Sequence, residues 1–180
     1  QVNFSAMSLD APVFDYKESP KFLVLSSILR NEYLHRRVRE QGGAYGGGAT
    51  YDPFAGSFKL FSYRDPRFTE TYEDFSESFE WAAKGNFDDE ILLEGKLSVL
   101  SDHDKPSSPA GEAFKDYRFN IEGKEQKVRT QYRTNIIQVT KDEVVEAANL
   151  LKDQPKRLFS IVNSSLEKRA VEEGFVIKRI

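Results

Sequence analysis

The sequence predicts an α+β fold in which helices pack on one face of a mostly antiparallel sheet. Three observations lead to this prediction. Residues 1–9 alternate between apolar and polar side chains, as a strand does. Residues 44–51 and 57–63 are typical of paired strands, because the turn-forming segment 52–56 separates them. Several long stretches with apolar residues three and four apart follow, which indicates helices.

The first helix is expected to begin with Ser19 as its cap and Pro20 at its first helical position. A second helical stretch buries Tyr33, Leu34 and Val38 and ends at Gly42-Gly43. Further helices are expected at 65–83, 88–100, 111–119, 125–135, 140–151 and 165–173, and further strands at 157–162 and 175–180. Asp65 is expected to cap the helix that follows it, and a capping box is expected at 140–143. In the helix 88–100 the expected buried residues are Ile91, Leu92, Leu97 and Leu100.

Length and composition narrow the class of protein. The 180 residues suit one domain, 1–180, with 39% hydrophobic and 31% charged residues. The net charge of −3 and its mixed distribution disfavour nucleic acid or an anionic membrane as partner. Disulfides and thiolate metal sites are excluded because there is no cysteine, and no signal peptide or membrane-spanning run is recognised. Because the chain begins inside a predicted strand, we expect it to be part of a longer protein.

A complete catalytic apparatus is not found in this sequence. The two histidines, His35 and His103, are 68 residues apart, and neither belongs to a zinc-hydrolase motif. No serine lies in a Gly-x-Ser-x-Gly elbow. Acidic runs such as 88–90 and 172–173 are more typical of helix ends than of acid/base pairs. We therefore expect no metal site and no cofactor in this chain.

The segment 39–49 stands out because it holds five of the eleven glycines within seven positions. A phosphate-binding loop runs from strand through glycines to helix, whereas here the helix comes first, so nucleotide binding is disfavoured. Glycines at 46–48 leave room for an extended chain or another domain to lie against the strand. Tyr45 then offers a phenol and Arg39 a cation, which together suit a polarised peptide carbonyl.

Residues 34–49, read as Leu-His-Arg-Arg-Val-Arg-Glu-Gln-Gly-Gly-Ala-Tyr-Gly-Gly-Gly-Ala, resemble a stretch of the presequence proteases. These form the falcilysin-like branch of the pitrilysin/insulinase superfamily of zinc metallopeptidases. The similarity continues at 62–66, 80–82, 94–98 and 107–109 and becomes weak beyond about residue 112. It departs from the commonest form of the family at Gln41, where Lys is frequent.

The resemblance implies the fold of the LuxS/processing-peptidase-like metallohydrolases and the C-terminal, zinc-free domain of such an enzyme. In that family the N-terminal domain binds zinc, and the C-terminal domain supplies an Arg and a Tyr to the active site across a chamber that holds unfolded peptides. The matching positions here are Arg39 and Tyr45, with Gly46, Gly47 and Gly48 expected beside the peptide. The implied partners are a peptide substrate and the other domains of the parent chain.

Alternatives remain open at this point. Arg36 or Arg37 could replace Arg39, Arg39 could form only a surface ion pair, and Tyr45 could pack in the core. A different class of function is a non-catalytic structural or protein-interaction domain of the same fold. Such a domain has no need of the spacing between Arg39 and Tyr45, so the sequence favours the peptidase.

Overall fold

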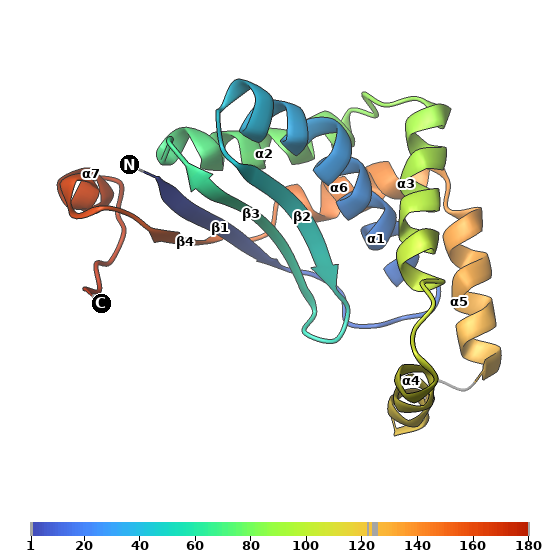
Figure 1. Ribbon diagram of the computed structural model, residues 1–180. Coiled ribbons are helices and arrows are strands. Elements are labelled where there is room, and N and C mark those ends of the chain that lie inside the picture. Colours follow the sequence, from blue (N-terminus) through green and yellow to red (C-terminus); the bar gives the residue numbers. More distant parts are fainter. Residues whose placement is uncertain (1, 122, 124–125, 180) are drawn as a thin grey trace.

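A computed structural model describes residues 2–121, 123 and 126–179. Its sheet has four antiparallel strands in the order β2-β3-β1-β4 (Figure 1). The strands are β1 (Asn3–Asp10), β2 (Gly46–Asp52), β3 (Ser57–Asp65) and β4 (Arg157–Ile161). The helices are α1 (Ser19–Ile28), η1 (Leu29–Gln41), α2 (Thr69–Ala83), α3 (Asp89–His103), α4 (Pro109–Ile121), α5 (Gln126–Gln138), α6 (Lys141–Lys152), the short η2 (Ser164–Leu166) and α7 (Glu167–Glu172).

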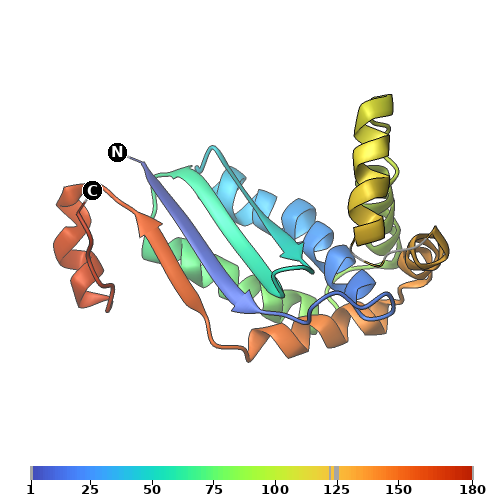
Figure 2. The same cartoon turned by 90° about the horizontal axis from the view of Figure 1, so that it is seen from below.

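The sheet has one covered and one open face. Helices α1, η1, α2 and α6 lie along the same face, and no helix of the described residues covers the other face (Figures 1 and 2). Alternation along β1 matches this arrangement, because Met7 and Leu9 are buried while Phe4 is 44% exposed. An antiparallel sheet with helices on one face is the predicted α+β class, which the structure confirms.

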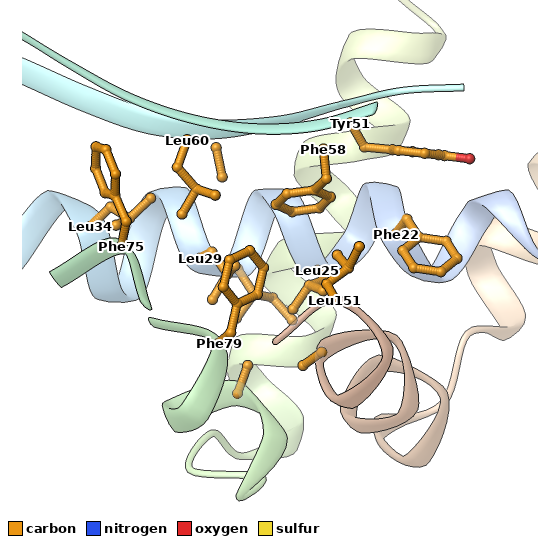
Figure 3. Packing of buried hydrophobic residues seen from close by; sticks show 14 of the residues in the cluster. Phe22, Leu25, Leu29, Leu34, Tyr51, Phe58, Leu60, Phe75, Phe79 and Leu151 are labelled. Atoms are coloured by element: carbon orange, nitrogen blue, oxygen red, sulfur yellow. The ribbon is translucent and has the colours of Figure 1, made fainter. Parts of the chain in front are cut away.

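The core lies between the sheet and these helices (Figure 3). Phe58 and Leu60 of β3 point down from the sheet, and Phe75 and Phe79 of α2 rise to meet them. The rings of Phe58 and Phe79 are 5.6 Å apart and tilted by 60°. Each of these fully buried side chains contributes roughly 1.5–3 kcal/mol of burial free energy. This packing fixes β3 on α2, and β3 in turn supports β2.

The two helical stretches predicted at 19–41 form one continuous rod whose second part, η1, is a π-helix of 13 residues. Its buried residues are Leu29, Leu34 and Val38. Leu29 and Val38 are nine positions apart over two turns, whereas an α-helix repeats after about seven. The wider spacing keeps both residues on the covered face. This π-helix was not predicted, although the spacing is a signal for it.

The predicted start of α1 is wrong by one position. Glu18 occupies the cap position without a side-chain cap, and Ser19 is already helical. The hydroxyl of Ser19 instead accepts a hydrogen bond from the backbone N–H of Asp15 at 2.9 Å. The Asp15 carboxylate accepts from the N–H groups of Lys17 and Glu18, at 2.7 and 3.0 Å. Asp15 therefore satisfies the turn ahead of the helix, so a serine cap is not needed.

The expected cap at Asp65 is also wrong, since α2 begins only at Thr69, after an uncapped Phe68. Asp65 is the last residue of β3 and is fully buried. Its carboxylate accepts from the N–H of Arg67 at 2.9 Å and from the hydroxyl of Thr71 at 2.7 Å. The side chain thus fixes the corner between β3 and α2 without capping the helix.

Two further predictions fail for reasons of packing. Leu97 is 56% exposed, because α3 meets α1 through Gly95, where an added Cβ would lie 2.7 Å from Ile28 Cγ1. The strand predicted at 175–180 is absent among the described residues 175–179, and Ile180 lies outside them. The Phe175 ring instead packs against the rings of Phe68 and Tyr72, with centroids 5.3 and 5.8 Å apart. The predicted capping box at Thr140 and Glu143 is confirmed.

Candidate functional site

A glycine turn joins the C-terminal end of η1 to the first residue of β2. Gly43 has φ of +78° and donates from its N–H to the carbonyl of Arg39 at 3.0 Å. The N–H of Ala44 donates to the carbonyl of Val38 at 3.1 Å. This is the hydrogen-bond pattern of a Schellman cap with each bond one residue longer, because the preceding turns are π-helical. Arg39 and Tyr45 are therefore joined by a fixed turn.

Arg67 supports this turn by linking the end of η1 to α2. Its guanidinium forms an ion pair with Asp74 of α2, with 2.8 Å between Nη1 and Oδ2, and its Nη2 donates to the carbonyl of Arg37 at 3.5 Å. A Cβ added at Gly42 would lie 2.1 Å from Arg67 Nη2 and 2.5 Å from the carbonyl oxygen of Val38. Gly42 is thus required for close approach of the backbone to Arg67.

We expect Gly42→Ala to lower the free energy of unfolding by about 1–3 kcal/mol, because the new methyl group must displace Arg67 or the helix backbone. The measurement is chemical denaturation of the domain. Gly111→Ala in the exposed α4 is the control, and it should be neutral or slightly stabilising because its neighbour Ser107 lies in a loop. Equal effects of the two substitutions would contradict the tight contact at Gly42.

The three candidate arginines of η1 have different surroundings. Arg37 is held on α2 by Asp74 at 3.3 Å and Glu77 at 2.9 Å. Arg39 is exposed, and its Nη1 donates to Nε2 of His35 at 3.2 Å. Because an arginine can only donate, Nε2 of His35 is the acceptor in this contact, and its Nδ1 lies 3.4 Å from Glu40 Oε1. Arg37 is therefore not available to a ligand, whereas Arg39 is.

Arg36 is exposed as well, and no carboxylate of the described residues lies within ion-pair distance of it. It remains an alternative to Arg39. Tyr33, one turn earlier, donates its hydroxyl to Glu77 at 3.1 Å. Burial, and then this hydrogen bond, raise the pKa of Tyr33 to about 12. Tyr33 and Arg37 thus belong to the contact between η1 and α2.

Tyr45 lies immediately before β2 and is 64% exposed, so it does not pack in the core. Its backbone N–H donates to the carbonyl of Arg64 at 3.3 Å. The Tyr63 ring lies 5.6 Å from the Tyr45 ring, tilted by 56°, and the Arg64 guanidinium lies 5.6 Å from the Tyr45 ring centre. Both neighbours belong to β3 and were not predicted, because they are distant in the sequence.

The glycines of β2 are packed against side chains of this same chain. An added Cβ would lie 2.5 Å from the Tyr63 ring at Gly46, 3.1 Å from Val38 at Gly47 and 3.2 Å from Arg30 at Gly48. Within the part of the chain that the structure describes, β2 pairs only with β3, so it is an edge strand. The glycines thus allow side chains of η1 and the rings of Tyr63 and Phe61 on β3 to approach the first half of β2 closely.

The open face of the sheet continues from Tyr45 as an apolar surface. Strand pairing places Gly46, Tyr63, Phe4 and Ile161 in one row across the sheet, and Gly48, Phe61, Ala6 and Phe159 in the next. The exposed fraction of Phe159 and of Ile161 is 60%. The following row is polar and holds Thr50, Lys59, Ser8 and Arg157. The apolar end of this face therefore borders the candidate site.

Across the described part of the chain, no cluster of three or more His, Cys, Asp or Glu side chains could hold a metal ion. His35 is engaged by Arg39, and His103 faces Asp104 with 3.1 Å between Nδ1 and Oδ1. Within the same residues no helix is long and apolar enough to cross a bilayer.

Residues 1–165 match the family described as the PreP C-terminal domain. The chain belongs to this family. The resemblance to presequence proteases stated above is thereby confirmed. The chain is 36% identical over 158 residues to the mitochondrial presequence protease of Eremothecium gossypii, covering 86% of this chain and 16% of that protein. It is 30% identical over 183 residues to that of Saccharomyces cerevisiae, covering 100% of this chain and 18% of that protein.

The fold is shared with solved peptidase structures. The peptidase M16 inactive domain from Pseudomonas fluorescens superimposes with a TM-score of 0.71 at 17% sequence identity, over 89% of this chain and 40% of that chain. At this identity the likeness concerns the fold alone. This PreP C-terminal domain spans less than a fifth of the length of the two presequence proteases compared.

Proposed function

We propose that residues 1–180 form the zinc-free C-terminal domain of a metallopeptidase that degrades unfolded peptides, and that Tyr45 and Arg39 complete its active site. The observation that carries the proposal is the exposed Tyr45 phenol, held by a rigid turn six residues after an Arg without a carboxylate partner among the described residues. Membership of the PreP C-terminal domain family supports it. The relatives' name, presequence protease, supports peptides as the substrate class.

The role proposed for this domain is to stabilise negative charge on the carbonyl oxygen of the scissile bond. Zinc, which we assign to another domain of the parent, would supply the attacking water. The Tyr45 hydroxyl donates a hydrogen bond to the oxygen as its charge grows. Arg39 presents several N–H donors in one plane, which suits a peptide carbonyl or the Tyr45 oxygen.

The peptide backbone is proposed to run beside Gly46, Gly47 and Gly48, at the edge strand next to Tyr45. An edge strand presents unpaired backbone groups to an extended chain. The neighbouring apolar rows of the open face, with Phe4, Phe61 and Tyr63, suit the apolar side chains of an unfolded peptide. An unfolded peptide can present such an extended segment along its length.

The chain 1–180 alone is expected to bind no stoichiometric zinc and to hydrolyse no peptide, since the described residues contain no metal-binding cluster. Metal analysis after dialysis and a peptide-cleavage assay measure this. The full-length parent should carry zinc and lose its cleavage activity on chelation. Zinc bound by the isolated chain in a 1:1 ratio, or a full-length parent without peptidase activity, would contradict the proposal.

A structural role remains the second candidate, and one observation favours it. Helix α4 exposes Phe114, Tyr117 and Ile121 by 64%, 63% and 69%, and none of its residues is buried. These three residues lie on one side of the helix, as an interface with another domain requires. A contact with the other domains of the parent is compatible with the peptidase role. If the full-length protein cleaves no peptide, the structural role is the candidate that remains.

A further inference from the structure

Arg64 has an unusual backbone conformation. With φ of +50° it is the only non-glycine residue in the left-handed region among the residues that the structure describes. This region is unfavourable for side chains with a Cβ, and glycine adopts it without strain. Residues held in this way persist where the surrounding structure requires them, and they cluster at functional sites.

The conformation belongs to a β-bulge. Phe4 pairs with Tyr63 and Asn3 with Asp65, so Arg64 has no partner on β1. At the comparable position of a common bulge type the residue is glycine. By simple alternation Arg64 would point to the covered face, but the extra residue turns it outward, where it is exposed. Asp65 then points inward and holds the corner to α2.

The bulge directs Arg64 to Tyr45. The guanidinium carbon lies 5.6 Å from the Tyr45 ring centre, within the range of a cation–π contact. The carbonyl of Arg64 accepts from the N–H of Tyr45, so backbone and side chain hold the same residue. No carboxylate of the described residues lies within ion-pair distance of Arg64. The Tyr63 ring is a second neighbour of the Tyr45 ring, with 5.6 Å between the two ring centres.

We propose that Arg64 is a positioning residue for Tyr45, which restrains the exposed ring so that its hydroxyl faces the substrate carbonyl. Glycine would adopt the same backbone conformation without strain. We therefore attribute the presence of arginine at this position to its side chain. The inference rests on the proposed function of Tyr45. It adds a residue 19 positions away in the sequence that does not itself contact the reacting atoms.

The test uses the full-length peptidase. Arg64→Gly should keep or raise the Tm, because it removes the strain, and should lower kcat by about 5- to 30-fold with KM little changed. Arg64→Lys retains a cation and should recover at least half of the lost kcat. Lys59→Ala, which removes another cation from the open face of β3, is the matched control and should leave kcat unchanged.

A double-mutant cycle decides whether Arg64 acts through Tyr45. In the Tyr45→Phe background, where the hydroxyl is already gone, Arg64→Gly should cause no further loss of kcat. An equal loss in both backgrounds, a loss confined to KM, or an unchanged kcat in Arg64→Gly would each overturn the positioning role. If Tyr45→Phe itself leaves kcat intact, the proposed function fails, and that result is distinct from a failure of Arg64 alone.

Discussion

Replacing Tyr45 with Phe in the full-length peptidase is expected to lower kcat by about 10²–10³-fold, the typical effect of removing one oxyanion donor. The substitution keeps the ring, which packs beside Tyr63 and Arg64, and removes only the hydroxyl. KM should change little, because the hydrogen bond strengthens mainly in the transition state. Steady-state kinetics on a fluorogenic peptide, with zinc content and Tm recorded for both proteins, measure this.

Tyr63→Phe is the matched control for this experiment. Tyr63 is the neighbouring phenol on the same face, with an exposed fraction of 38%. Its hydroxyl has no proposed role, so kcat should stay within about twofold of the unmodified enzyme. A Tyr45→Phe enzyme that raises only KM would show uniform binding of substrate and transition state, and the oxyanion role would be wrong.

Arg39→Lys is expected to lower kcat/KM by about 10- to 100-fold, since an ammonium cannot reproduce a planar, two-pronged contact. The fold should be unaffected, because Arg39 is exposed and its only described side-chain contact is with His35 of the same helix. The measurement is kcat/KM together with the Tm.

Arg36→Lys distinguishes the two exposed arginines of η1. Because the turn after η1 links Arg39, not Arg36, to Tyr45, this variant should retain nearly full activity. A larger loss in Arg36→Lys than in Arg39→Lys would transfer the role to Arg36. Arg37 is unsuitable for the same comparison, since its ion pairs with Asp74 and Glu77 make any effect partly structural.

Most of the fold follows from local patterns. The alternation in β1, the turn between β2 and β3 and the capping box at Thr140 each predict their element correctly, because neighbours in the sequence decide them. The failures concern positions decided by distant residues. Leu97 is exposed because Gly95 is the residue that α1 contacts, and 175–179 forms no strand because Phe175 packs on Phe68 and Tyr72.

The candidate site divides in the same way. The helix–glycine–strand order predicts a turn between Arg39 and Tyr45, and the structure shows one. The support of this turn by Arg67 could not be predicted, because Arg67 meets Gly42 and pairs with Asp74 only in the folded chain. Likewise, nothing local marks Arg64 as a residue in the left-handed region. Local sequence patterns therefore mark the exposed candidate residues more readily than the residues that hold them in place.

The position of β1 in the interior of the sheet has a consequence for how the domain is made. Within this domain, residues 3–10 are made before the segment 57–65 with which they pair, and they must then wait for 157–161, which complete the sheet on their other edge. Pairings over such long separations close slowly, because the intervening chain loses much of its freedom before the contact forms. Until β4 arrives, β1 presents an unpaired edge beside the exposed Phe4. During synthesis this edge is where we expect mispairing and chaperone binding to concentrate.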